Sequence, residues 1–453
     1  MNHSPSQLLI TVRPVFRRPA LLIGIVVLAA TAVGAADPSP LRLTLHEAVT
    51  IALKQSPNVQ IANITVAESA QDRNISRSFL LPQVQSSVSE GWRKDNLATI
   101  LGRQPPAGIA LNRGFQVVEG GVTASVPLFD LSLWRRYKAS QYAQLSAGAQ
   151  RVGVREQTVL LVVSQYLSCM RATARVQAAQ SRVDLAQALY KLASDRLASG
   201  AGTKLDALRA NVELKNEKQG LIIANTLLET SLYGLSKLLH LDPAQPIEIS
   251  DQMKYFDTSA SPLQTEVAEA YRNRPEMKTL IARQQELQQE KKAARATRLP
   301  KITLSGSWAY AGLRPGESTP VYEYDAAVSV PLFTGGRIKA EITKSDLALQ
   351  KLDQETQGLR DRIALEVKNA NAQLQAARNE VEVANSGIQL AHDEVGQARD
   401  RFQAGVANNI EVITAQDELS RASDNQIDAL YRFNQSRADL AHAMGHIETL
   451  YSK

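Results

Sequence analysis

Two histidines near the end of the chain have the spacing that comes closest to supporting chemistry. His442 and His446 lie four residues apart in the segment predicted as the last helix, so both imidazoles would share one helix face, as in a metal-binding pair. No third ligand is evident in the sequence, and we expect solvated helix positions instead. A Gly-rich phosphate loop and a convincing pairing of nucleophile and base are also missing. The residues therefore predict no enzyme, no bound metal and no cofactor.

The N-terminus has the pattern of an export signal. Three arginines, Arg13, Arg17 and Arg18, precede an apolar run over residues 20–30, and small residues follow it up to Ala36. This order of basic, apolar and small residues predicts a secretory signal peptide at 1–36, cleaved near its end. The alternative is a membrane anchor, but the apolar stretch is at the short limit for spanning a bilayer and no charge cluster follows it.

The charge balance and the hydropathy exclude two classes of protein. The chain has 51 basic and 45 acidic side chains, a net charge of +6, which falls to +3 without the three arginines of the signal. A nucleic-acid binder needs a basic surface, so nucleic acid is not expected as a partner. The mean hydropathy of −0.21 excludes a bundle of membrane-spanning helices. Any membrane crossing after the signal would therefore be made by strands.

The mature chain contains the same landmarks twice and in the same order. Each half has a Leu-Pro pair, a Val-Pro-Leu-Phe stretch and an Asp-Arg pair shortly before a glycine. The matching positions are Pro82 and Pro300, Pro127 and Pro331, Arg196 and Arg401, and Gly200 and Gly405. This self-similarity predicts a tandem duplication, with a first repeat at 37–242, a linker at 243–262, a second repeat at 263–447 and a C-terminal tail at 448–453.

Each repeat is predicted to end in two long helices joined by a tight turn. Residues 128–242 and 332–453 contain no proline, which would cost about 3 kcal/mol inside a helix, and the only strong break in each is the glycine named above. The first helix of each pair is predicted at Ser132–Ser199 and Gly336–Ala404. At about 1.5 Å per residue, such a helix is on the order of 100 Å long. It requires a coiled coil or a helical tube.

A heptad pattern in these helices supports the coiled-coil prediction. From Ile363 to Phe402, apolar residues follow one another mostly in alternating steps of four and three, and an equivalent series runs from Cys169 to Leu197. Large residues alternating with Ala permit close packing in a left-handed supercoil. Cys169, the only cysteine, belongs to this series. We therefore interpret it as a buried packing residue and not as a reactive thiol.

Two segments of strand character precede each long helix. They are predicted at 83–94 and 115–129 in the first repeat, and at 301–312 and 322–333 in the second. The last alternates apolar residues such as Tyr322 and Tyr324 with polar residues such as Glu323, and its length suits a tilted transmembrane strand. The segments between the strands, 95–114 and 313–321, are expected to be exposed loops. Two soluble hairpins are the alternative, because the signal of each strand is weak.

Four strands do not close a membrane-spanning sheet on their own. An open edge would leave unpaired N–H and C=O groups in hydrocarbon, so closure needs several chains. Three chains would supply twelve strands and enclose a lumen, and their helices would continue it as a hollow tube. The predicted fold is therefore mostly α-helical with a small membrane β-barrel, in which a trimeric twelve-stranded barrel continues into a long helical barrel.

The ordered motifs resemble those of the TolC family of outer-membrane factors. The resemblance covers essentially the whole mature chain, through the opening Leu43–Val49, the strand entries at Pro82 and Pro300, the strand exits at Pro127 and Pro331, and the glycine turns in both repeats. It implies a homotrimeric exit duct in the outer membrane, with a periplasmic helical extension. Its implied partners are outer-membrane lipid, a periplasmic adaptor and an inner-membrane pump. A periplasmic coiled-coil adaptor is the alternative function.

The resemblance also implies roles for the hairpin turns. Gly200 and Gly405, beside Arg196 and Arg401, would lie at tips that face the adaptor. Their matched positions favour this interpretation, although any helix can end in a glycine.

Two acidic residues follow these glycines at the spacing of the family's periplasmic entrance. Glu411 matches the outer of two acidic ring positions, and Asp206 is its counterpart in the first repeat. Three copies of Glu411 around a threefold axis would attract cations and oppose full closure. The alternative is an acid favoured by the dipole at a helix N-terminus.

The entrance departs from the family pattern. Thr414 stands at the inner acidic ring position, and Phe402 and Ala407 stand where the resemblance places a latching Tyr and Arg. Arg209, three residues after Asp206, is the candidate substitute in the latch. We therefore expect a single charge ring and a more weakly latched gate.

Overall fold

The computed structural model describes residues 40–94, 102, 114–242, 244–256 and 262–452. Residues Pro40–Lys453 form one compact unit. The signal predicted at 1–36 and nearly all of the loop predicted at 95–114 lie outside the described residues.

Six elements occur twice in the same order within this unit. The first series is α1 (Leu45–Gln55), α2 (Pro57–Ser78), β2 (Gln83–Arg93), β3 (Phe115–Phe129), α4 (Leu131–Ala198) and α5 (Lys204–Leu239). The second is α6 (Leu263–Asn273), α7 (Pro275–Ala296), β5 (Lys301–Gly312), β6 (Thr319–Ser329), α8 (Arg337–Gln403) and α9 (Asn409–Ala443). In both series, a proline at the first helical position starts the second helix, where its missing N–H costs no hydrogen bond.

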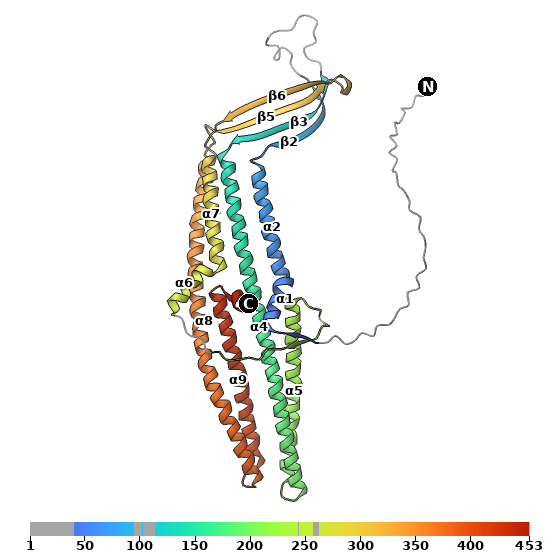
Figure 1. Cartoon of the computed structure of the whole chain (residues 1–453), viewed down its shortest axis with the longest axis vertical. Coiled ribbons are helices and arrows are strands. Elements are labelled where there is room, and N and C mark those ends of the chain that lie inside the picture. The colour runs from blue at the N-terminus through green and yellow to red at the C-terminus, as the bar shows by residue number, and fades with distance from the viewer. Residues whose placement is uncertain (1–39, 95–101, 103–113, 243, 257–261, 453) are drawn as a thin grey trace, which may run out of the picture. The chain divides into compact units, whose positions relative to one another are not determined.

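Both predicted long helices are confirmed. The α4 helix has 68 residues and α8 has 67, and their return helices α5 and α9 have 36 and 35. The turns of both hairpins lie at one end of the unit and the four-stranded sheet lies at the other (Figure 1).

Most of the heptad positions are buried in the hairpin cores. Ile363, Leu374 and Phe402 of α8 are buried, and so is Cys169 of α4. Burial raises the pKa of the Cys169 thiol to about 12, which agrees with a packing role. Leu197 departs from this pattern, because its side chain is 39% exposed in the last turn of α4.

The four strands form one antiparallel sheet in the order β2-β3-β5-β6. The bounds of three strands agree with the sequence within one residue, but β6 spans Thr319–Ser329 and not 322–333. It ends before Pro331, which has no N–H to donate to the ladder. Pro320 can lie within this strand because, among the described residues, β6 pairs on one side only, where a missing N–H is tolerated.

The register separates the sheet into an apolar face and a polar face. Trp308 pairs with Tyr322 and Gly306 with Tyr324, and the ring of Tyr324 lies within 3.0 Å of the position of a Cβ on Gly306. The neighbouring positions on the other face are polar, because Ser305 pairs with Asp325 and Ser307 with Glu323. The aromatic members of the apolar face are all exposed. They are Trp92, Trp308, Tyr310, Tyr322 and Tyr324.

The segments predicted as a linker and a tail both contain regular structure. Strand β4 (Ile247–Ile249) pairs in parallel with β1 (Leu41–Leu43), and α10 (Ile447–Tyr451) is the last helix of the described residues. Ile447 is fully buried, and Glu448 forms an ion pair with Arg155 at 2.5 Å. In the described parts of the chain, no helix combines the length and the apolar character needed to cross a bilayer.

Candidate functional site

The two hairpin turns have the same backbone geometry. Gly200 and Gly405 both have φ of 75°, in the left-handed region that glycine adopts without strain. The residue after each glycine donates its N–H to the carbonyl of the residue five positions earlier. Ala201 donates to Arg196, and Val406 donates to Arg401. These bonds satisfy the carbonyl groups at the ends of α4 and α8. The matched glycines therefore build matched turns.

The return helices begin with different caps. At α5, the Thr203 hydroxyl accepts the N–H of Asp206 and donates to the Asp206 carboxylate at 2.6 Å. At α9, the Asn408 side chain accepts the N–H groups of Ile410 and Glu411 at 3.1 and 3.3 Å. The Asp206 carboxylate is thus held in its own cap, whereas the Glu411 carboxylate takes no part in the cap.

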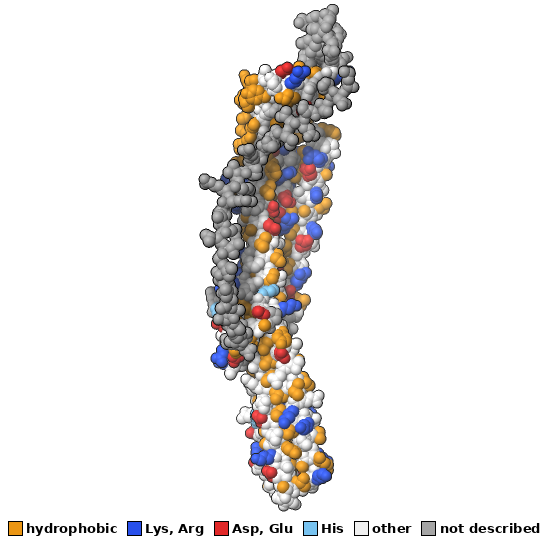
Figure 2. Space-filling model, turned by 90° about the vertical axis from the view of Figure 1, so that its right-hand side faces the viewer, with side chains coloured by type: hydrophobic (Ala, Val, Ile, Leu, Met, Phe, Trp, Pro, Cys, Tyr) orange, Lys and Arg blue, Asp and Glu red, His pale blue; other side chains and the backbone are white. Residues whose placement is uncertain are grey.

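Glu411 instead pairs with an arginine of the same hairpin. Its carboxylate accepts Nε of Arg401 at 2.9 Å, and both side chains are about half exposed. An exposed pair of this kind contributes at most about 1 kcal/mol, but it places a positive charge beside each Glu411. Figure 2 shows basic and acidic side chains interspersed near this end of the molecule.

Arg196, the counterpart of Arg401, reaches the other hairpin. Its guanidinium donates to the Phe402 carbonyl and lies 4.9 Å from the centre of the Phe402 ring. A second link joins the same tips, because the fully buried Asn409 donates to the Asp206 carbonyl at 2.9 Å. The two turns are therefore joined by a side chain from each hairpin.

Other arginines of α4 continue these links along the hairpins. Arg175 donates to both carboxylate oxygens of Asp428 at 2.9 Å, and Arg182 approaches Asp424 at 3.5 Å. Positions 175, 182 and 196 share one heptad position, so the sequence did carry a signal for them. Arg175, Arg182 and Asn409 were not among the site residues predicted from the sequence.

Arg209 and Thr414 of the predicted entrance are exposed. Within the described residues, no ion pair joins Arg209 to Asp206, whose carboxylate bonds Thr203 instead. The structure therefore brings Asp206 and Glu411 to the same end of the molecule, but it does not show the proposed Asp206–Arg209 contact.

The prolines predicted at the strand ends lie there. Pro82 and Pro300 directly precede β2 and β5, Pro127 lies near the end of β3, and Pro331 follows β6 by two residues.

The two histidines do not occupy solvated helix positions, so this prediction is wrong. His442 is near the end of α9, and His446 lies beyond a turn at Gly445, as the residue before α10. Both side chains are partly buried, and burial lowers the pKa of each imidazole. Among the described residues, no group of three His, Cys, Asp or Glu side chains is placed to hold a metal.

Comparisons with known proteins agree with this architecture. The model of the outer membrane efflux protein family matches residues 48–239 and 267–446. The sequence is 23% identical to the pyoverdine export outer membrane protein OpmQ of Pseudomonas aeruginosa, over 87% of this chain and 83% of OpmQ. It is 19% identical to the outer membrane protein TolC of Vibrio cholerae, over 82% of this chain and 83% of that protein.

Solved structures share the fold. The CmeC outer membrane channel of Campylobacter jejuni superposes with a TM-score of 0.74 over 89% of this chain and 85% of CmeC, at 18% identity. The chain belongs to the outer membrane efflux protein family. The resemblance to the TolC family is confirmed, and this family is one of channel proteins and not of enzymes.

Proposed function

We propose that the protein is the outer-membrane exit duct of a tripartite efflux or secretion system. It would receive substrates from an inner-membrane pump and a periplasmic adaptor and pass them to the exterior. Three chains would form a twelve-stranded β-barrel in the outer membrane and a continuous helical tube in the periplasm.

The observation that carries this proposal is the two-faced sheet joined to long helices. Exposed Trp and Tyr side chains on one face suit lipid, and the Ser, Glu and Asp side chains on the other suit a water-filled lumen. The outer strands β2 and β6 each pair on one side only in the described chain. Their open edges would be unpaired in a bilayer, and pairing β6 with β2 of the next copy removes every edge.

The hairpin turns would form the periplasmic entrance. Glu411, Thr414, Asp206 and Arg209 would line it, while Gly200, Gly405, Arg196 and Arg401 would lie at the tips that meet the adaptor. Because Arg401 neutralises Glu411 in part, a ring of three Glu411 would repel itself less than three isolated carboxylates. The links from Arg196 and Asn409 would hold the two tips of each chain together and act as the latch.

The repeat boundaries predicted from the sequence are part of this proposal. The mature protein would comprise a first repeat up to residue 242 and a second from 263 to 447, following removal of the signal at 1–36. An adaptor, the alternative prediction, does not fit a chain with two hairpins and a four-stranded sheet.

The test is detergent extraction from membranes followed by mass determination and planar-bilayer recording. We expect a trimer from the outer-membrane fraction that conducts ions. A soluble monomer without conductance would refute the proposal. Within a conducting trimer, unchanged conductance and cation preference in Glu411→Ala would refute the gate assignment alone.

A further inference from the structure

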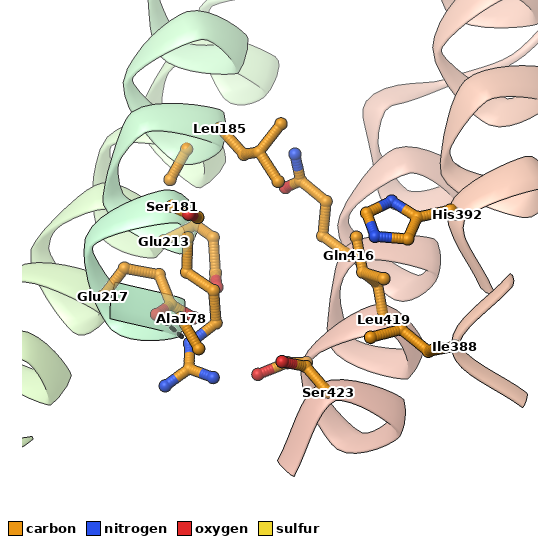
Figure 3. Close-up of a pocket in the computed structure, with 13 residues that line it drawn as sticks. Ala178, Ser181, Leu185, Glu213, Glu217, Ile388, His392, Gln416, Leu419 and Ser423 are labelled. Carbon is orange, nitrogen blue, oxygen red and sulfur yellow. Dashed lines mark hydrogen bonds and ion pairs between the residues drawn. The ribbon is translucent and has the colours of Figure 1, made fainter. Parts of the chain in front are cut away.

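A cavity lies between the two hairpins, partway along their length. It is lined by all four helices, α4 and α5 on one side and α8 and α9 on the other (Figure 3). We propose that this cavity binds a small amphipathic organic cation, of the arylalkylammonium class. The binding does not depend on the duct function proposed above.

The apolar part of the cavity would hold a hydrocarbon or ring. Leu185 of α4, Ile388 of α8 and Leu419 of α9 line it, and Leu419 is buried. Figure 3 shows these side chains on opposite walls, with Leu185 across from Ile388 and Leu419. An apolar surface of this kind favours a ligand that carries apolar area out of water.

The polar part of the cavity has an excess of acidic groups. Glu213 and Glu217 of α5 line it, together with Arg182 of α4. Arg182 is already engaged by Glu217 at 3.2 Å and by Asp424 at 3.5 Å. Within the lining, one positive charge therefore faces two carboxylates, and the other polar groups are hydroxyls, one amide and the exposed imidazole of His392.

Glu213 is the carboxylate that most needs a counter-ion. Burial raises its pKa, and the charges of Asp417 and Glu217 raise it further, while a hydrogen bond with Asn216 opposes the shift. A cation beside Glu213 would favour its ionised form. Affinity for a permanently charged cation should consequently increase as Glu213 loses its proton at higher pH.

The volume limits the size of the occupant. The cavity holds about 180 Å³, which is below the roughly 300–1,000 Å³ of sites for drug-sized ligands. A ligand with a single aromatic ring and an ammonium group is small enough for this volume. Because an occupant would contact both hairpins, it would also favour the arrangement in which they are packed together.

Calorimetric titration of benzyltrimethylammonium into the full-length, detergent-solubilised protein tests this proposal. The charge of this probe does not titrate, so any pH dependence belongs to the protein. We expect binding at pH 8 that weakens at pH 5, and at least a tenfold weaker affinity in Glu213→Gln. Benzenesulfonate, an aromatic anion of similar size, should not bind.

Three variants locate the site. Ser423→Leu, which fills the cavity from α9, should also weaken binding, and Glu229→Gln, an exposed position on the same helix as Glu213, should not. Glu411→Gln should leave binding unchanged, because the tips are a separate acidic region. Binding that survives Glu213→Gln, or that is lost in Glu411→Gln, would overturn the proposal. A conducting trimer that does not bind the probe would refute this inference and leave the duct function standing.

Discussion

The two hairpin turns share a backbone but use equivalent side chains differently. Arg196 and Arg401 lie 205 residues apart in the sequence, and each precedes a glycine with the same φ. Arg401 binds Glu411 of its own hairpin, whereas Arg196 crosses to Phe402 of the other. A repeated motif thus fixes the turn geometry, while the neighbours of each copy decide which contacts its charged residues make.

The same contrast occurs along the shafts of the helices. Glu156 of α4 is only 6% exposed, and its equivalent in α8, Asp361, is exposed. Burial, followed by the charge of Glu276, raises the pKa of Glu156 to about 7. The first repeat therefore buries an acid that the second repeat leaves in solvent.

The largest predicted effect comes from this buried acid. The folded protein holds the Glu156 proton more tightly than the unfolded chain, in which the pKa of this carboxyl is 4.5. The tighter binding of this proton therefore stabilises the folded protein fully below pH 4.5, and this stabilisation is lost as the pH rises through 7. The free energy of unfolding of Glu156→Gln, taken relative to that of the wild type, should increase by about 3 kcal/mol when the pH is raised from 4.5 to 8.5. Chemical denaturation at both pH values measures the difference. Asp361→Asn is the control, and an equal gain there would contradict the contrast.

The link from Arg196 is expected to have the next largest effect. Arg196→Ala removes a charged hydrogen bond and a cation–π contact between the hairpins. The free energy that holds the two tips together should therefore decrease by about 2 kcal/mol. Amide hydrogen exchange should accelerate over both turns. Arg401→Ala should affect its own turn only. Equal acceleration in both variants would show that the two arginines are interchangeable.

The glycines should give equal effects and so confirm the shared backbone. Gly200→Ala and Gly405→Ala each place a side chain in the left-handed region, at roughly 1–2 kcal/mol. Steric contacts of the added Cβ should not make the two variants differ. The Cβ at position 200 would have no neighbour within 4 Å, and the Cβ at position 405 would lie 3.6 Å from Nη2 of Arg196, an ordinary van der Waals distance. Thermal unfolding of both variants measures this. A clear difference between the two would mean that the turns are not equivalent.

The smallest effect is expected at Glu411. Glu411→Gln removes an exposed ion pair that contributes less than about 1 kcal/mol to stability. Asp206→Asn leaves the hydrogen bond from the backbone N–H of residue 206 to the Thr203 hydroxyl in place. Stability should hardly change in either variant. Reversal potentials in a salt gradient should show a reduced cation preference for Glu411→Gln, and an unchanged preference would show that the ring does not set it.

The backbone of this molecule could be predicted from sequence because its signals are local. Long stretches without proline, the heptads and the glycines predict the helices and turns, and alternation predicts the strands. β1 and β4 have only three residues each and pair across about 200 positions, so no periodic signal marks them.

The side-chain partners of the tips could not be predicted in the same way. Asn409 donates to a carbonyl 203 residues earlier, and this contact depends on how the two hairpins pack. The burial of His442 likewise follows from contact with residues near Arg274, which donates to the His442 carbonyl. Contacts between distant segments depend on tertiary packing, which a single sequence does not display.

Single-channel recording of the wild type beside Arg196→Ala tests the central claim most directly. A duct whose tips are held closed by the link from α4 to Phe402 should conduct in the wild type and conduct several-fold more in the variant. No conductance in either protein would contradict the duct, and equal conductance in both would contradict the latch.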